Sequence, residues 1–189
     1  VNTSIQLVPI RDKLDRNMEI LGIPHDADNR STGVTQNLVN VDPLESARMQ
    51  IVFREEEGLN VRYYARKFIK PSIEYRQEEL NKITHLCLHI KNPQGLNKLN
   101  IGFVTNLGFT YTSLINLQSN QSVYKINISD FRQTETALLP ETYPIFMKRY
   151  FYPSLNIPFH IQDIELLEIA TEPISLSTAS YELGAVWLE

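Results

Sequence analysis

Apolar and polar residues alternate along several short stretches of the chain, and turn-forming residues separate these stretches. In the segment around residue 88, apolar side chains occupy every second position, at Leu86, Leu88 and Ile90. The segments 99–103 and 124–128 show the same alternation. A period of two is typical of half-buried strands, in which one face meets the core. Such strands at intervals of roughly ten residues predict an all-β fold, an antiparallel β-sandwich or jelly roll.

Two of the predicted strands keep this period only if the backbone is locally irregular. The apolar residues of 161–169 fall on one face if a bulge or a single helical turn lies near Asp163. The last strand, 181–188, slips its period around Gly184, which indicates a bulge. No helix of ordinary length and no tandem repeat is predicted. The chain is therefore expected to form one sandwich domain over 1–189, in which 1–45 could be leading strands or a linker.

Composition narrows the classes of function. The net charge is −4 and Lys and Arg form no cluster, so nucleic acid is not an expected partner. No apolar run reaches the roughly 20 residues that span a bilayer, and no targeting signal is visible at the N-terminus. Because the first residue is Val1, we expect a processed chain or one module of a larger protein. Cys87 is the only cysteine, so a disulfide within the chain is excluded.

A segment rich in Tyr, Phe and Pro, Tyr143–Pro153, separates two predicted strands and is too long for a hairpin turn. Aromatic rings offer flat apolar faces to the C–H side of a sugar, and Tyr and Arg can bond its hydroxyls. In the alternative interpretation the segment folds back and plugs the end of the sandwich, and Trp187 on the last strand has the same two interpretations. The candidate carbohydrate-binding residues are Tyr143, Arg149, Tyr150 and Tyr152.

Residue types that perform catalysis are present, but not in a diagnostic arrangement. His85 and His89 lie roughly 13 Å apart along a strand, so they cannot jointly bind one metal ion. Acidic residues at 55–57, 78–79 and 165–168 could supply the two carboxylates of a glycosidase, but runs of this kind are more often solvated. No catalytic residue is assigned.

Four segments resemble a known family. They are Ile83–Asn92, Ile126–Phe131, Ile161–Thr171 and Tyr181–Leu188, within roughly residues 45–189. The resemblance is to the galactose-binding-like β-sandwich of carbohydrate-binding modules, which also occurs as an accessory domain of secreted glycoside hydrolases and polysaccharide lyases.

This resemblance implies a jelly roll that binds a polysaccharide or oligosaccharide without cleaving it, beside a neighbouring catalytic domain. It also implies an extracellular, cell-surface or periplasmic location and a structural calcium ion, for which Glu182 occupies the position of an acidic ligand. Two alternatives remain at this stage. One is a structural sandwich that packs against a catalytic domain, and the other is a small glycan-cleaving enzyme.

Overall fold

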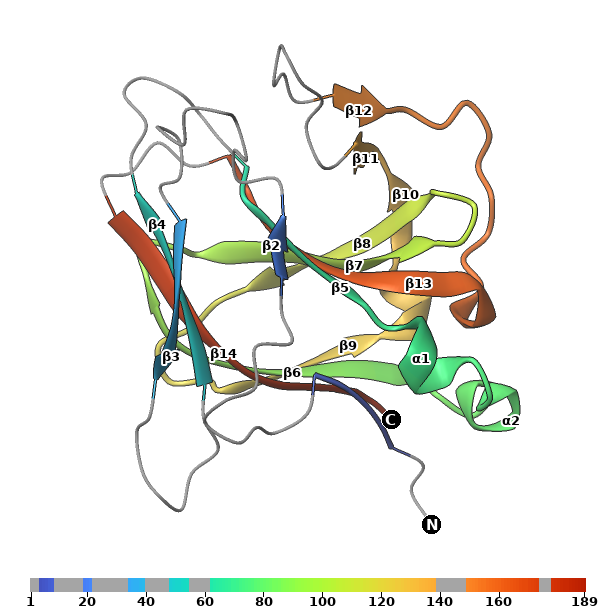
Figure 1. Cartoon of the computed structure of the whole chain (residues 1–189), viewed down its shortest axis with the longest axis horizontal. Helices are drawn as coiled ribbons and strands as arrows, with labels where there is room; N and C mark the ends of the chain where they lie inside the picture. Colours follow the sequence, from blue (N-terminus) through green and yellow to red (C-terminus); the bar gives the residue numbers. More distant parts are fainter. Residues whose placement is uncertain are drawn as a thin grey trace.

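The structure is a computed structural model, and it describes residues 4–8, 19–21, 34–39, 48–54, 62–138, 149–173 and 178–189. Several sequence predictions lie outside these ranges: the candidate Tyr143, the acidic run 55–57, and most of 1–45. The chain folds into two antiparallel sheets that enclose one core, with a short two-stranded ribbon outside them (Figure 1).

The first sheet, here called sheet A, is centred on the last strand of the chain. Its order is β3-β4-β14-β6-β9, and β1 pairs with the end of β14 beyond β4. Its strands are β1 (Ile5–Val8), β3 (Val34–Val39), β4 (Arg48–Arg54), β6 (His85–Gln94), β9 (Val123–Asn127) and β14 (Thr178–Leu188).

The second sheet, sheet B, has the order β10-β8-β7-β13-β5-β2. Its strands are β2 (Glu19–Leu21), β5 (Tyr64–Phe68), β7 (Lys98–Thr105), β8 (Thr110–Asn116), β10 (Arg132–Thr134) and β13 (Ile164–Thr171). The ribbon consists of β11 (Thr136–Leu138) and β12 (Arg149–Phe151). Two helices of one turn each, α1 (Lys70–Ile73) and α2 (Gln77–Leu80), join β5 to β6.

The core is built by the apolar faces that the sequence pattern predicts. Leu86, Leu88 and Ile90 of sheet A are fully buried, and they belong to the same cluster as Leu99 and Phe103 of sheet B. Burying a side chain of this size contributes roughly 1.5–3 kcal/mol to folding. One continuous cluster links the two sheets, so the predicted antiparallel β-sandwich is confirmed.

Both predicted irregularities are also confirmed. The turn near Asp163 is a 3₁₀ helix, Ile161–Asp163, immediately before β13. On β14 the register against β6 shifts between Leu183 and Val186, on either side of Gly184. The shift lets residues before and after it face the same core.

The shortest elements, β10, β11, β12 and the one-turn helices α1 and α2, were not predicted. Residues 149–151, which the sequence analysis placed inside an aromatic loop, form strand β12 and pair with β11. A strand of three residues is too short for an alternating pattern to be visible, and its partner is equally short. The ribbon lies beside sheet B, above β7 and β8 in the view of Figure 1.

Candidate functional site

The face of sheet B that points away from the core, here called its open face, carries polar side chains across several strands. Alternation along β13 turns Leu167 and Ile169 into the core and therefore turns Glu168 and Ala170 outward. The register then places Arg66 of β5 beside Glu168. The sequence pattern that builds the core thus also places the polar groups opposite it.

These side chains surround a small groove with a volume of about 140 Å³. We call it the groove and define it by the residues that line it: Arg62, Tyr64, Asn100, Thr112, Thr134, Glu135, Glu168, Ala170 and Glu172.

A glycine contributes to the depth of the groove. Gly102 pairs with Thr112 on one side and with Glu168 on the other, so it lies between two lining residues. A β-carbon on Gly102 would lie 2.1 Å from the carbonyl oxygen of Tyr111, which no side chain tolerates. Glycine in a strand interior often marks such a close approach of backbone.

A buried ion pair lies at the bottom of the groove. Nε of Arg66 donates to Oε2 of Glu168 over 2.6 Å, and both side chains are nearly inaccessible to solvent. Nη2 of Arg66 also donates to the carbonyl oxygen of Ala137, 2.9 Å away in the ribbon. Burial raises the pKa of the Glu168 carboxyl, and the Arg66 charge opposes that rise.

The other charged groups of the groove are also engaged. Nη1 of Arg62 donates to Oε1 of Glu135 over 2.8 Å, with both side chains about one-third exposed. The Asn100 amide donates to Glu172 across the floor. The charged residues that line the groove are one arginine and three glutamates, a formal charge of −2, which the buried Arg66 behind Glu168 reduces to −1. Arg62 and Arg66 each already have an anionic partner.

The ribbon forms one wall of this region. The Tyr64 hydroxyl donates to the Tyr150 hydroxyl over 3.2 Å, and the two rings pack with Ala137 and Ala170. Burial, then the bond to Tyr150, raises the pKa of Tyr64, so its hydroxyl stays protonated and keeps this bond. The Thr136 hydroxyl fixes the ribbon to β8 through Thr110.

None of the predicted residues lines the groove itself, and Tyr150 comes nearest to it because it contacts the lining residue Tyr64. Tyr150 is partly buried and bonded to Tyr64, whereas Tyr152 is 70% exposed with its ring 6.3 Å from that of Tyr150. Arg149 is exposed at the start of β12. Tyr143 lies outside the described residues. Tyr150 partly fits the interpretation in which the aromatic segment packs against the sandwich. Tyr152 fits the interpretation in which the segment is exposed.

Of the residues of sheet B in this region, the sequence analysis considered only Glu168, as one of a pair of carboxylates with Glu165 in β13, and it did not place it in a binding site. A charged residue, Arg66, likewise lies within β5. No pattern in the sequence, however, indicates that Arg66 and Glu168, 102 residues apart, meet face to face.

The other acidic candidates lie elsewhere. Glu165 pairs with Lys70, 3.8 Å away, and Glu79 pairs with Arg76 near α2. Among the residues that the structure describes, no group of three His, Cys, Asp or Glu side chains could hold a metal ion.

Glu182 was the expected acidic ligand of a structural calcium ion. It lies in the middle of β14, between Gln50 of β4 and Lys91 of β6, and Oε1 accepts a bond from the Asn92 amide over 2.8 Å. Calcium requires six to eight oxygen ligands. Around Glu182, the Asn92 amide donates a hydrogen bond and Lys91 carries a positive charge, so these two neighbours do not fit that requirement. Calcium stays a prediction from the resemblance, and no role is derived for it.

Comparison with known proteins supports the fold. No family model matches the chain, and no curated protein matches it in sequence. Solved structures do match. A family 11 carbohydrate-binding module from Clostridium thermocellum, in complex with a β-1,3-1,4-mixed-linked tetrasaccharide, is similar with a TM-score of 0.56 at 11% identity, over 98% of this chain and 94% of that one.

Larger enzymes contain a similar domain. An agarase matches 98% of this chain with a TM-score of 0.58 at 10% identity, and an exo-β-agarase matches 97% with 0.59 at 8%. The chain spans about a quarter of each enzyme, 24% and 25%. At these identities the similarity establishes the fold alone: this chain has the β-sandwich fold of carbohydrate-binding modules, as the four sequence segments predicted.

No helix among the described residues is both long and apolar enough to cross a membrane.

Proposed function

We propose that the chain is a non-catalytic carbohydrate-binding module and that its site is the groove on the open face of sheet B. The observation that carries this proposal is the composition of the groove: hydrogen-bonding side chains from separate strands converge beside Tyr64, Tyr150 and the exposed Tyr152. Sugars require this combination, because their hydroxyls need donors and acceptors while their C–H faces pack on rings.

The charges favour a neutral glycan. Arg62 and Arg66 are both neutralised by glutamates, and the third glutamate leaves the groove formally negative. A sulfated or uronate-rich chain is negatively charged, so the net negative charge of the groove would repel it. The groove also offers it no cation that lacks an anionic partner. A neutral polysaccharide presents only hydroxyls, for which the Asn and Glu side chains are suitable partners.

The engagement of the carboxylates favours binding over cleavage. A glycosidase needs one carboxyl as acid and another as nucleophile or base. In the groove, Glu168 is paired with Arg66, Glu135 with Arg62 and Glu172 with Asn100. Each carboxylate is therefore already bonded to a donor side chain of this region. In the proposal it holds that side chain in place for a ligand.

In this proposal the domain brings a larger extracellular enzyme to its polysaccharide. The position of a similar domain in agarases, as about a quarter of the enzyme, supports this role. The similar module solved with a mixed-linked tetrasaccharide indicates which glycans to test first.

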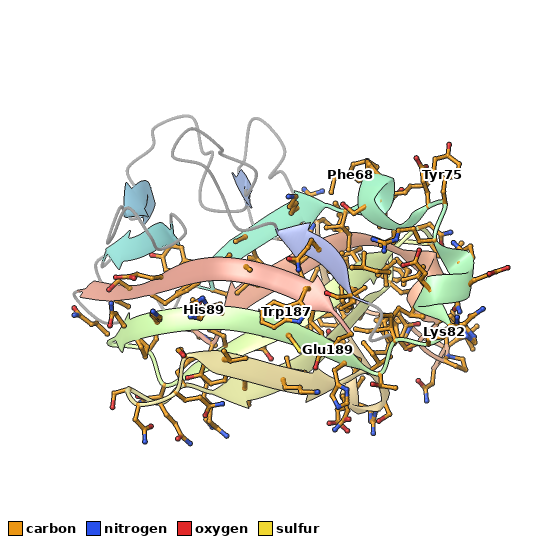
Figure 2. The ribbon with its side chains drawn as sticks, turned by 90° about the horizontal axis from the view of Figure 1, so that it is seen from below. Phe68, Tyr75, Lys82, His89, Trp187 and Glu189 are labelled. Carbon is orange, nitrogen blue, oxygen red and sulfur yellow. The ribbon has the colours of Figure 1, made fainter. Side chains whose placement is uncertain are left out.

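The test is isothermal calorimetry with soluble mixed-linkage β-glucan and with agar oligosaccharides, using the wild type and Tyr152→Ala. We expect the wild type to bind at least one of them and Tyr152→Ala to bind it several-fold more weakly, because a lost ring contact costs about 1 kcal/mol. Tyr75→Ala is the matched control, since Tyr75 is 90% exposed beside the short helices (Figure 2) and does not line the groove.

Arg62→Gln provides a second test within the groove. It removes the partner of Glu135 without emptying the core, so we expect weaker glycan binding and an unchanged fold by circular dichroism. Retention of full affinity by both Tyr152→Ala and Arg62→Gln would place the site elsewhere. Binding to no glycan would favour a structural domain, and release of reducing ends would favour the enzyme.

A further inference from the structure

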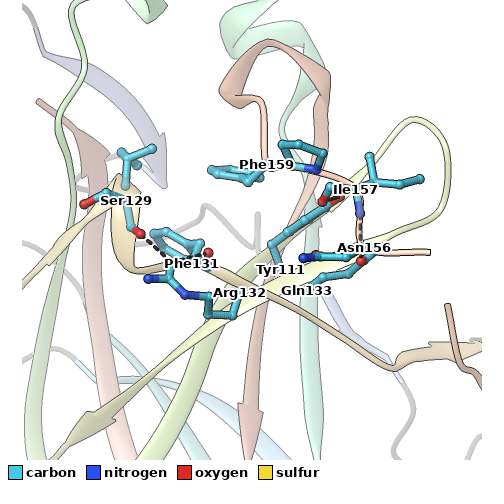
Figure 3. Close-up of a pocket in the computed structure, with 10 residues that line it drawn as sticks. Tyr111, Ser129, Phe131, Arg132, Gln133, Asn156, Ile157 and Phe159 are labelled. Carbon is cyan, nitrogen blue, oxygen red and sulfur yellow. Dashed lines mark hydrogen bonds between the residues drawn. The ribbon is translucent and has the colours of Figure 1, made fainter. Parts of the chain in front are cut away.

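A second pocket lies at the same edge of sheet B, where residues of β8 and β10 and of the segments 128–131 and 156–159 line it. Gln133 of β10 pairs with Tyr111 of β8, and both point toward the core side, whereas the flanking Thr112 and Thr134 line the groove. We call this second site the edge pocket. It has a volume of about 410 Å³, and its other main walls are Phe131, Arg132, Ile157 and Phe159 (Figure 3).

The apolar part of the edge pocket is rigid. Phe159 stacks on Phe103 with 5.9 Å between ring centroids and an interplanar angle of 9°, and it also contacts Phe131 and Tyr111. The Tyr111 hydroxyl donates to the carbonyl oxygen of Ile157 over 2.8 Å. These contacts tie the pocket wall to the core, so the volume is part of the fold.

The polar part of the lining includes the guanidinium of Arg132 and the amide of Gln133. Arg132 is held through Nη1, which donates to the carbonyl oxygens of Ser129 and, over 3.0 Å, of Phe131. In the part of the chain that the structure describes, Arg132 forms no salt bridge, and its Nε and Nη2 atoms make no hydrogen bond. These two atoms form the edge of a guanidinium that binds a carboxylate through two parallel bonds.

A second donor is also without a partner. Oε1 of Gln133 accepts from the backbone N–H of Ile157 over 3.1 Å, which fixes the orientation of the amide. Its Nε2 atom is buried and has no partner among the described residues. No acidic side chain occurs among the described residues that line the pocket.

We propose that the edge pocket is a second binding site, distinct from the groove, for a ligand that carries a carboxylate on a five- or six-membered ring. The ring packs against the aromatic wall near Phe159, and the carboxylate binds Arg132. A sugar acid and an aromatic acid share this chemistry, and the groove, with its paired arginines, lacks it. An apolar pocket of a few hundred Å³ with a few placed polar groups is the usual form of a small-molecule site.

The test is a titration of the ¹⁵N-labelled full chain with sodium glucuronate, sodium benzoate and glucose, followed by amide chemical shifts. We expect glucuronate or benzoate, but not glucose, to shift the amides of residues 129–133, 156, 157 and 159. Stronger binding of glucuronate would identify a sugar acid as the source, and stronger binding of benzoate an aromatic acid.

Arg132→Gln should lower that affinity by about tenfold or more, because a hydrogen-bonded charge contributes roughly 1.5–3 kcal/mol. Arg132→Lys keeps the charge but loses the two parallel bonds, so it should also bind more weakly. Lys98→Gln is the control: it removes one exposed positive charge of β7 outside the pocket.

The outcomes separate this site from the groove. Loss of glucuronate or benzoate binding in Arg132→Gln with unchanged glycan binding supports two independent sites. Three results would overturn the proposal: equal binding of the tighter-binding acid by Arg132→Gln and the wild type, binding of glucose as tight as that of this acid, or no shift at residues 129–133 with either acid. Failure of Tyr152→Ala to weaken glycan binding would count against the proposed glycan site in the groove and would not affect the proposal for the edge pocket.

Discussion

At the scale of single residues, the ion pair of Arg66 and Glu168 is the most consequential feature of the groove. Its two charges are buried within 2.6 Å of each other. Removing one member of such a pair leaves a buried charge unpaired, which costs roughly 3–5 kcal/mol. We therefore expect Arg66→Met to lower the free energy of unfolding in urea by about this amount at pH 7.

The loss in Arg66→Met should depend on pH. Burial raises the pKa of Glu168 above the ordinary value of 4.5, and without Arg66 the pKa rises further. The folded state then holds this proton more tightly than the unfolded chain, so stability falls as the pH rises above 4.5. Urea unfolding should show a smaller loss near pH 4.5 than at pH 7. An equal loss at both values, or no recovery at pH 7 in Arg66→Met/Glu168→Leu, would contradict this account.

Gly102 provides a second prediction for a single residue. Gly102→Ala should be strongly destabilising, because its β-carbon would meet the Tyr111 carbonyl oxygen at 2.1 Å and backbone cannot easily move away. Gly184→Ala is the matched control, since the nearest atom there is Nδ1 of the His89 side chain at 2.9 Å. The midpoint temperature of thermal unfolding should be much lower for Gly102→Ala than for Gly184→Ala. The opposite order would mean that the β7–β8 contact can relax.

At the scale of elements, long strands could be predicted and short ones could not. Strands β6, β7 and β13 have eight to ten residues, enough for an alternating face to be visible. Strands β11 and β12 have three each, so pairing between them, and not pattern, defines them. The groove was missed for a related reason, since its residues belong to several strands whose proximity arises only in the folded sheet.

The ribbon should depend on a small number of polar anchors. The Thr136 hydroxyl interacts with the carbonyl oxygen of Gly108 at 3.0 Å and with the Thr110 hydroxyl at 2.8 Å. Thr136→Val keeps the shape of the side chain and removes these bonds. We therefore expect the free energy of opening of the ribbon to fall by about 1 kcal/mol. Hydrogen exchange should accelerate in β11 and β12 more than in β7. Thr84→Val is the control, because the Thr84 hydroxyl bonds Glu189 beside sheet A. Uniform acceleration in Thr136→Val would show that the ribbon opens only with the sandwich.

At the scale of the whole molecule, the two proposed sites share one edge of sheet B. Strands β8 and β10 contribute Thr112 and Thr134 to the groove on one face and Tyr111 and Gln133 to the edge pocket on the other. The alternation that produces a core therefore also separates two binding chemistries: a groove whose cations are paired, and a pocket whose arginine lacks an acidic partner among the described residues. Both sites are held by the same core, so their integrity depends on the sandwich remaining one cooperative unit.

Cys87 can test that cooperativity, because it is the only cysteine and lies buried in sheet A between Trp187 and Lys125. Burial, followed by the Glu189 charge, raises the pKa of its thiol to about 11, so the folded protein should react slowly with a disulfide reagent at pH 8. Cys87 alternates with the core residues Leu86 and Leu88, so its thiol lies on the outer face of sheet A and becomes accessible when its neighbours move locally or when the sandwich opens. Gly102→Ala acts in sheet B, yet where the sandwich opens as one unit it should increase labelling of Cys87 by the factor that corresponds to its loss of stability in urea. Unchanged labelling in that variant would mean that Cys87 becomes accessible by local movement or that the two sheets open independently.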